Sequence, residues 1–261
     1  MNILDKIVVQ KKKEVAEKKE LYPTPLLEKS TFFDSQTISL SHYIKRKDKS
    51  GIIAEFKRKS PSKPAINLYA NAEEVSISYM QAGASALSIL TDTTFFGGKS
   101  EDLIAARKYN FCPILRKDFI IDEYQIIEAR SIGADAILLI AEILTKEKIS
   151  QLSSLAHSLG MEVLLELHSE SQLEKYAEGI KLIGVNNRDL DTFETDVNFS
   201  KQLISKLPTE VIKISESGIH SAGVVRELKE IGYDGFLIGE RFMQNAHPGD
   251  ACKSFIQEIS T

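Results

Sequence analysis

The stretch Gly51-Ile52-Ile53-Ala54-Glu55-Phe56-Lys57-Arg58-Lys59-Ser60-Pro61-Ser62 is the first of a series of similar units. It begins with an apolar run typical of a buried β-strand and ends in a polar turn. Comparable β-type runs recur along the chain, and a helical segment follows each of them. The eight runs are Gly51–Phe56, Ala84–Leu90, Cys112–Leu115, Asp135–Ile140, Met161–Glu166, Leu182–Val185, Val211–Ile214 and Gly235–Ile238.

Helical patterns occupy the segments after these runs, and several end at a glycine, the usual residue just past a helix. The segments are Ala72–Ala82, Ser100–Lys108, Asp122–Ser131, Thr145–Leu159, Ser169–Ala177, Asn198–Ser205, Ser221–Glu230 and Pro248–Ile259. Eight strand–helix units in about 210 residues match the α/β class and its (β/α)8 TIM barrel. The alternative, an open doubly wound sheet, usually has a glycine-rich turn after its first strand. Residues 57–62 contain no glycine, so we predict the barrel.

The first 50 residues differ from this pattern. We predict an N-terminal helical extension over residues 1–50 and a single catalytic barrel domain over residues 51–261. Leu4–Lys19 has apolar residues at helical spacing among many lysines, which predicts one amphipathic helix, and two prolines then end it. Ile38–Lys45 is predicted as a second, short helix. Because the barrel is complete without them, these helices are expected to cover one of its ends.

The composition is that of an ordinary globular protein, with 43% hydrophobic and 27% charged residues in a chain of 261. The 33 Lys and Arg against 37 Asp and Glu leave a net charge of −4, so no strong field attracts nucleic acid or an anionic membrane. Cys112 and Cys252 form neither a metal-ligand pattern nor a disulfide framework, which favours a reducing compartment. No targeting or membrane-spanning segment is visible, so we expect a cytoplasmic protein.

Charged residues lie in or just after several of the apolar runs, where a barrel gathers its reactive groups. Strand alternation places Glu55 and Lys57 on the face opposite Phe56, so both should point into the barrel mouth. Lys117 and Glu166 lie at equivalent positions at the ends of two other runs. Two lysines in one mouth should lower each other's pKa, an effect that Glu55 would counter. A structural ion pair and solvated loop charges are the alternative interpretations.

A polar stretch after the sixth run contains Asn186 and Arg188, and two later loops suggest an anion site. Ser217-Gly218 follows the seventh run and Gly239-Glu240 the eighth. Glycines there let backbone N–H groups approach an anion, and barrel enzymes often bind phosphate at this pair of loops. The alternative is that the glycines only permit tight turns.

Two other features carry weaker signals. The five histidines show no zinc-ligand spacing, so no metal site is predicted, and each is interpreted as a surface or capping residue. His168 is the only histidine at the expected rim. Residues 91–98, TDTTFFGG, are expected to form an aromatic wall or lid, or to pack as an ordinary loop.

Many of these stretches resemble motifs of the indole-3-glycerol phosphate synthase family. The first strand with AEFKRKSPS and the third with LRKDF carry the resemblance most clearly. The matching stretches are residues 3–8, 54–62, 90–92, 96–98, 115–119, 184–190, 216–219 and 237–240. Since the motifs occur in order over nearly the whole chain, the resemblance is specific.

The resemblance implies a reaction of tryptophan biosynthesis, the ring closure of 1-(2-carboxyphenylamino)-1-deoxyribulose 5-phosphate with loss of CO₂ and water. It implies no metal or organic cofactor. It also implies that Lys117 protonates the ketone oxygen, that Glu166 is the base in dehydration, and that Lys57 is the candidate acid for the departing hydroxyl. The other implied site residues are Glu55 and Glu216 in the charge network, Asn186, Arg188 and Ser60 at the carboxylate and ribulose, and Ser217, Gly218, Gly239 and Glu240 at the phosphate.

Two residues depart from the family pattern. Pro64 stands where glycine is usual, which predicts a stiffer loop after the first strand. Glu142 stands where an uncharged residue is expected. Two other interpretations stay open: a Schiff-base-forming barrel aldolase acting on a sugar phosphate, because rim lysines can form imines, and a non-catalytic phosphate-binding barrel. The expected partner is a phosphorylated small molecule, with no nucleic acid or membrane, and the expected assembly is a monomer or weak homodimer.

Overall fold

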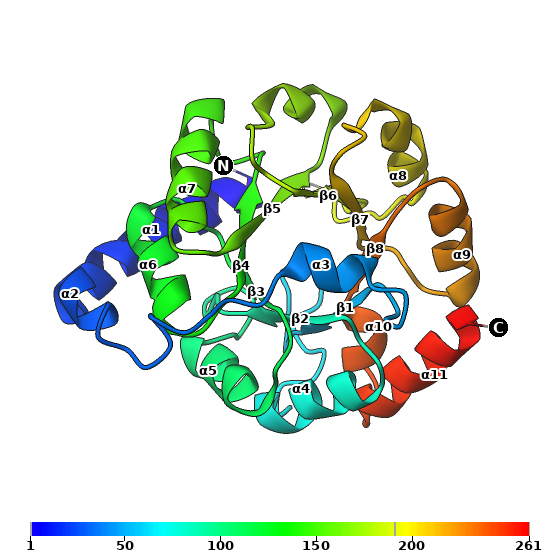
Figure 1. Cartoon of the computed structure of the whole chain (residues 1–261), viewed down its shortest axis with the longest axis horizontal. Helices are drawn as coiled ribbons and strands as arrows, with labels where there is room; N and C mark the ends of the chain where they lie inside the picture. The colour runs from blue at the N-terminus through cyan, green and yellow to red at the C-terminus, as the bar shows by residue number, and fades with distance from the viewer. Residues whose placement is uncertain (1, 191, 261) are drawn as a thin grey trace.

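The computed structural model describes residues 2–190 and 192–260, and its eight parallel strands close into one barrel in chain order (Figure 1). The predicted (β/α)8 TIM barrel is therefore confirmed. The strands are β1 (Ile52–Phe56), β2 (Ala86–Leu90), β3 (Ile114–Lys117), β4 (Ala136–Ile140), β5 (Glu162–Leu167), β6 (Leu182–Asn186), β7 (Ile212–Glu216) and β8 (Gly235–Ile238).

Helices surround the barrel; most connect consecutive strands, and α10 and α11 follow the last strand (Figure 1). They are α4 (Ala72–Gln81), α5 (Ser100–Tyr109), α6 (Glu123–Ser131), α7 (Lys146–Ser158), α8 (Asn198–Leu203), α9 (Ala222–Glu230), α10 (Glu240–Met243) and α11 (Pro248–Ser260). The prediction was wrong after β5, where Ser169–Ala177 contains only the 3-10 helix η1 (Glu170–Lys175). The side chain of Gln172 accepts a hydrogen bond from the backbone of His168 at 2.8 Å, which holds this connection in a tight turn. A second 3-10 turn, η2 (Ile204–Lys206), follows α8.

Alternation along the strands separates two apolar layers, as the sequence predicted for β1. Ile53 lies in the barrel interior, while Ala54 and Phe56 pack between the barrel and its helices. Burial of a side chain as large as Ile53 or Phe56 contributes about 1.5–3 kcal/mol to the free energy of unfolding. The inward positions are apolar along most of the barrel, and the charged residues Glu55, Lys117, Glu166 and Glu216 lie at or near the carboxyl ends of β1, β3, β5 and β7.

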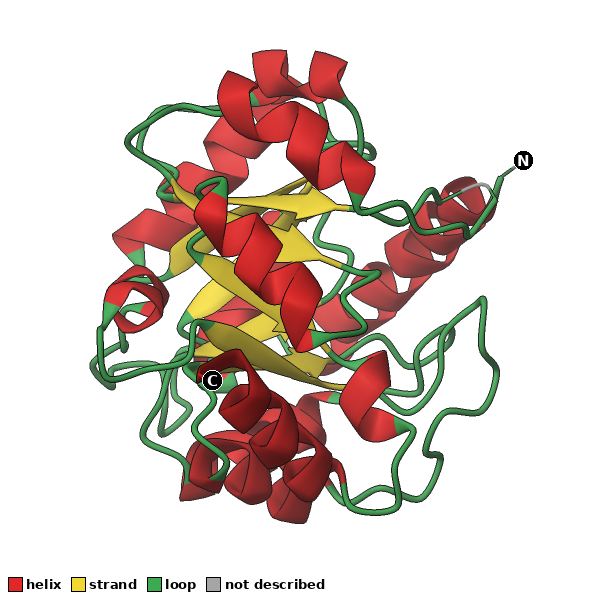
Figure 2. Ribbon diagram, turned by 90° about the vertical axis from the view of Figure 1, so that its right-hand side faces the viewer, coloured by secondary structure: helices red, strands yellow, loops and turns green. Residues whose placement is uncertain are grey.

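The N-terminal extension contains α1 (Ile3–Leu21), α2 (Thr24–Leu27) and α3 (Leu40–Lys45). Helices α1 and α3 cover opposite ends of the barrel, whereas one end was expected, and α2 packs against α6. Leu40 and Ile44 of α3 reach the interior core at the amino ends of the strands. In Figure 2 the long helix α1 lies on the side to which the strand arrows point. Both ends are reached because residues 22–39 run past α6, where Ser30 Oγ donates to the backbone oxygen of Ser131 at 2.7 Å. None of the described helices combines the length and apolarity needed to cross a membrane.

Candidate active site

A cavity opens at the carboxyl ends of the strands, and every site residue predicted from the sequence lines it. These residues are Glu55, Lys57, Ser60, Lys117, Glu166, Asn186, Arg188, Glu216, Ser217, Gly218, Gly239 and Glu240. These residues are far apart in the chain. They lie close together because the strands are parallel, so the carboxyl ends of all strands lie at the same rim of the barrel.

The centre of the cavity is a lysine between two carboxylates. Lys117 Nζ lies 2.7 Å from Glu166 Oε2 and 2.5 Å from Glu216 Oε2. Burial lowers the pKa of Lys117, but Glu166, Glu216 and Glu55 raise it more, so the net shift is upward. The sequence left the sign of this shift open, with Glu55 opposing the lysines, and the structure gives an upward shift because carboxylates outnumber ammonium groups around Lys117.

The two carboxylates respond in opposite directions. Burial raises the pKa of Glu166, but Lys117, His168 and a hydrogen bond from Glu216 together lower it by more, so the net shift is downward. Burial also raises the pKa of Glu216, and the negative charge of Glu166 adds to it, so Glu216 holds a proton well above the ordinary carboxyl range. One ammonium cannot neutralise two buried carboxylates, so one of them stays protonated. In addition, Glu216 Oε1 is buried without a hydrogen-bond partner among the described residues.

Gly184 makes room for Glu216. A Cβ atom at this position of β6 would overlap Glu216 Oε1 and come within 3.4 Å of Leu164. Gly184 was not identified as a site residue from the sequence, since a glycine inside a strand carries no chemistry of its own. Its closeness to a polar strand end was the available signal.

The second ion pair of the cavity joins Lys57 Nζ and Glu55 Oε1 at 2.7 Å, as strand alternation predicted. Gly239 has a supporting role here as well, because a Cβ atom at this position would lie 2.5 Å from Glu55 Oε1 and 2.9 Å from Glu55 Cβ. The side chain of Glu55 is 5% exposed, so its charge depends on Lys57 for compensation.

The loops after β7 and β8 form the polar edge of the cavity. Ser217 has φ 65° and Gly218 φ 71°, and a left-handed serine is strained by about 1–3 kcal/mol. Glu240, which begins α10, pairs with Lys63 Nζ at 2.8 Å and lies 3.7 Å from Arg188 Nη2. Lys63 was not predicted from the sequence to be near the site. Two backbone hydrogen bonds between Ser60 and Lys63, at 2.9 and 3.0 Å, close the turn that carries it, and Pro64 follows directly.

An apolar wall faces this polar edge. Phe96 lines the cavity, as expected if residues 91–98 form an aromatic wall, and its ring centroid lies 5.9 Å from that of Phe119. Three residues of α1 complete the wall: Ile3, Leu4 and Ile7. The residues of α1 and Phe119 were not predicted as site residues. The α1 residues reach the cavity only because the helix packs against the rim, and Phe119 lies in the loop after β3.

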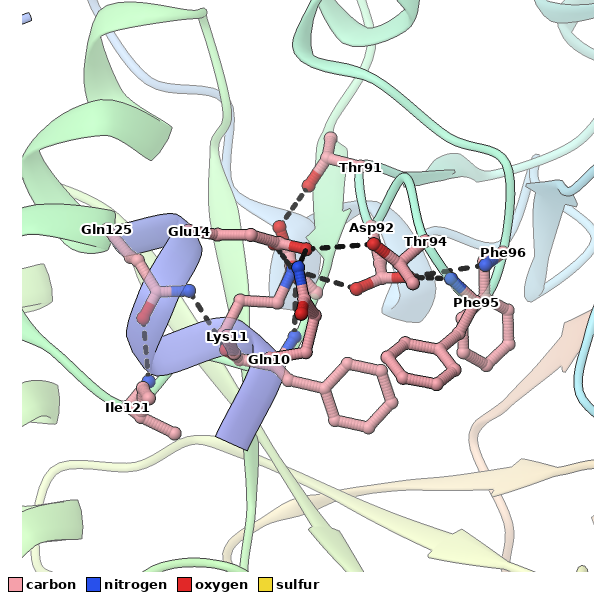
Figure 3. A network of polar contacts seen from close by, with 12 residues as sticks. Gln10, Lys11, Glu14, Thr91, Asp92, Thr94, Phe95, Phe96, Ile121 and Gln125 are labelled. Atoms are coloured by element: carbon pink, nitrogen blue, oxygen red, sulfur yellow. Dashed lines mark hydrogen bonds and ion pairs between the residues drawn. The ribbon is translucent and has the colours of Figure 1, made fainter. Parts of the chain in front are cut away.

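A buried ion cluster fastens α1 to the rim (Figure 3). Lys11 Nζ lies 2.8 Å from Asp92 Oδ2 and 3.0 Å from Asp118 Oδ1, and its side chain is 4% exposed. Asp92 Oδ1 also accepts hydrogen bonds from the backbone of Phe95 and Phe96, at 2.8 and 3.2 Å. Lys11 therefore connects the helix both to the aromatic wall and to the residue after Lys117.

Glu142, for which the sequence offered no role, accepts a hydrogen bond from Gln172. No group of His, Cys, Asp and Glu within residues 2–190 and 192–260 is arranged to hold a metal ion. The cysteines take no part in the cavity. Both are buried, and burial raises the pKa of each to about 12.

A (β/α)8 barrel with charged groups and strained backbone at the carboxyl ends of its strands has the architecture of a barrel enzyme. The family model described as "Indole-3-glycerol phosphate synthase" matches residues 4–255. The chain belongs to the indole-3-glycerol phosphate synthase family.

Curated relatives carry the same description. Indole-3-glycerol phosphate synthase from Bacteroides thetaiotaomicron is 47% identical over 258 residues and the match covers 99% of each chain. Indole-3-glycerol phosphate synthase 2 from Ralstonia nicotianae is 42% identical, and the match covers 98% of this chain and 97% of the relative. Among solved structures, 3-hexulose-6-phosphate synthase from Salmonella typhimurium has a TM-score of 0.63 at 14% identity, covering 80% of this chain and 98% of that one, which shows a shared fold.

Proposed function

We propose that this chain catalyses the decarboxylating and dehydrating ring closure of 1-(2-carboxyphenylamino)-1-deoxy-D-ribulose 5-phosphate to indole-3-glycerol phosphate. The observation that carries the proposal is the position of Lys117, held between Glu166 and Glu216 inside a cavity that has an apolar wall and a polar edge. An ammonium ion kept charged and aimed into a partly apolar cavity can protonate a ketone oxygen as that oxygen gains charge.

The steps follow from these groups. The aromatic carbon attacks the ketone carbon, the carbonyl electrons move to oxygen, and Lys117 transfers a proton to that oxygen. Loss of CO₂ then restores the aromatic ring. Lys57 gives a proton to the departing hydroxyl, and Glu166 accepts the proton released in dehydration. Glu216, whose raised pKa keeps it protonated, supplies a reserve proton beside Lys117.

Each group of the proposed substrate matches a different region of the cavity. The aromatic ring fits against Phe96 and Phe119, and the carboxylate and ribulose fit near Asn186, Arg188 and Ser60. The phosphate fits at the polar edge, which comprises Ser217, Gly218, Gly239 and Glu240. The steps need proton transfers only, so the proposal includes no metal or organic cofactor. We further propose a cytoplasmic monomer or weak homodimer with no nucleic-acid or membrane partner.

A fluorescence assay with the anthranilate-derived substrate tests the function. The chain contains no Trp, so an indole signal would rise from a low background. Indole fluorescence that grows with time supports the synthase. Substrate binding without any turnover would instead favour a non-catalytic phosphate-binding barrel. A mass adduct on Lys117 or Lys57 after borohydride treatment with substrate would favour a Schiff-base aldolase.

A further inference from the structure

His168 lies directly behind Glu166, just past the end of β5. Its Nε2 is 3.3 Å from Glu166 Oε1, and its side chain is 7% exposed. Glu166 uses its other oxygen, Oε2, to pair with Lys117 at 2.7 Å. His168 and Lys117 therefore flank the same carboxylate, and His168 is not among the residues that line the cavity.

Both ring nitrogens of His168 are buried and have no hydrogen bond to any residue in the described part of the chain. A buried polar atom without a partner costs about 1–3 kcal/mol. The position of the residue is nevertheless well defined, because its backbone N–H donates to Gln172 Oε1 at 2.8 Å. Gln172 in turn donates to Glu142. Glu142 and Gln172 thus brace an imidazole whose two nitrogens have no hydrogen-bond partner among residues 2–190 and 192–260.

In the proposed reaction, Glu166 needs a second hydrogen-bond donor, which the imidazole of His168 can provide. When Lys117 gives its proton to the ketone oxygen, it becomes a neutral amine until it regains a proton. Glu166 then keeps a buried negative charge without its ammonium partner, and an unpaired buried charge is strongly destabilised. The nearby ring nitrogen of His168 is a donor that is free to replace it.

We propose that His168 is a positioning residue for Glu166: its Nε2–H becomes the hydrogen-bond donor to Glu166 Oε1 when Lys117 engages the substrate. This inference rests on the proposed function. The bond keeps Glu166 ionised and oriented for its role as base in dehydration. No proton has to leave the imidazole, since a neutral ring with its hydrogen on Nε2 is sufficient.

The surroundings of the ring favour the neutral form. Burial lowers the pKa of His168, Glu166 opposes this shift, and Lys117 adds to it, with a net downward result. The other charged groups that face the ring are Glu142 and Asp189. A neutral imidazole has one N–H to donate, and Glu166 Oε1 is the acceptor 3.3 Å away.

The test compares three variants of the full chain in the indole fluorescence assay. His168→Leu removes the donor, His168→Asn moves it to the δ position, and His168→Gln keeps it at the ε position. A hydrogen bond to a charged group predicts that kcat falls about 10- to 100-fold in the Leu and Asn variants, with KM changed by less than about twofold. The Gln variant should stay within about threefold of wild type. His157→Leu, on α7 and away from the cavity, is the matched control.

The pH profile of kcat separates positioning from a merely structural role. Without the donor, the ionised form of Glu166 in the enzyme–substrate complex is less stable. The acid limb of kcat should therefore move to higher pH in the Leu and Asn variants but not in the Gln variant. Unchanged kcat in His168→Leu, or a loss without movement of this limb, would overturn the inference. If the Leu variant does not fold, equal rates in the Asn and Gln variants would do the same.

The outcomes also distinguish this inference from the proposed function. Wild-type protein that forms no indole product refutes the function and, with it, the role of His168. Active wild-type protein whose His168 variants retain full kcat refutes the role of His168 alone.

Discussion

Two buried clusters in this protein place one lysine between two carboxylates, yet they have different properties. Lys11 lies between the buried Asp92 and Asp118 and also pairs with the less buried Glu14 at 2.7 Å. Lys117 lies between Glu166 and Glu216. In the Lys11 cluster the carboxylates have several further donors. Asp118 accepts from Thr91 Oγ1 at 2.6 Å and from Arg116 at 3.0 Å, and the ion pairs continue through Glu128 to Lys18.

The supply of donors explains the difference in pKa. Burial raises the pKa of Asp118, but Lys11, Arg116 and the hydrogen bond from Thr91 lower it by more, so the net shift is downward. Glu216 has one lysine to share with Glu166, and its pKa is raised. In the Lys11 cluster, the donors compensate the buried carboxylates, so the ion pairs hold α1 against the barrel. In the Lys117 cluster, one ammonium group is shared by two carboxylates, so one carboxyl keeps a proton that can be transferred. Perturbed groups of the second kind are typical of active sites.

The largest expected effect concerns the Lys11 cluster. Lys11→Met should lower the free energy of unfolding by about 3–5 kcal/mol, because it leaves Asp92 and Asp118 as buried charges without their ammonium partner. Urea unfolding followed by circular dichroism measures the change. Lys12→Met, one position along the same helix at an exposed site, is the control and should be nearly neutral. Equal stability of the two variants would contradict the view that this cluster fastens α1 to the rim.

A substitution in the Lys117 cluster should lower the rate of catalysis. Lys117→Ala is expected to lower kcat by roughly 100-fold or more, since it removes the acid that protonates the ketone oxygen. Steady-state fluorescence kinetics provide the measurement, with the exposed Lys146→Ala as control. Near wild-type kcat in the Lys117 variant would rule out the assigned role.

Substitution at the polar edge should affect binding. Gly218→Val is expected to raise KM by about tenfold while changing kcat less, because loss of phosphate contacts weakens ground state and transition state alike. A valine there is strained at φ 71° and would contact Val197 and Thr195 at 3.3 and 3.4 Å. Gly223→Ala in α9, which has no positive φ, is the matched control. An effect on kcat alone would place the phosphate elsewhere.

The smallest expected effect is a change in how the free energy of unfolding depends on pH. The pKa of Glu216 is raised in the folded protein, so the folded state binds this proton more tightly than the unfolded state does. The stability from this group is present at low pH and is lost as the pH rises from the ordinary carboxyl range through the raised pKa.

Glu216→Gln removes this titration. The stability of the variant relative to wild type should therefore increase, by about 1 kcal/mol or more, between about pH 5 and about pH 9. Urea unfolding at a series of pH values measures the difference, with the exposed Glu210→Gln as control. A difference that does not change with pH would show that Glu216 is not the protonated member of the pair.

The sequence predicted the strands well because each is a local apolar run, and a period of two assigns its faces without knowledge of the fold. The positions of Glu55, Lys57, Lys117 and Glu166 followed from the same rule, since parallel strands end at one rim. The helix expected over Ser169–Ala177 was wrong because a contact of Gln172, four residues from the backbone group that it binds, outweighed the local pattern. Lys63, Phe119 and the wall residues of α1 were missed because their place depends on packing between distant segments.

The chain's own pattern of apolar and charged residues established a closed parallel barrel and the kinds of groups at its mouth, because alternation and strand order are local properties. The protonation states of those groups, in contrast, depend on contacts between residues that are distant in the chain. Lys117 and Glu216 are separated by 99 positions in the chain, and their 2.5 Å contact exists only after the barrel closes. Folding therefore decided which carboxyl holds a proton and which lysine fastens a helix, because charge interactions depend on distance and burial in space.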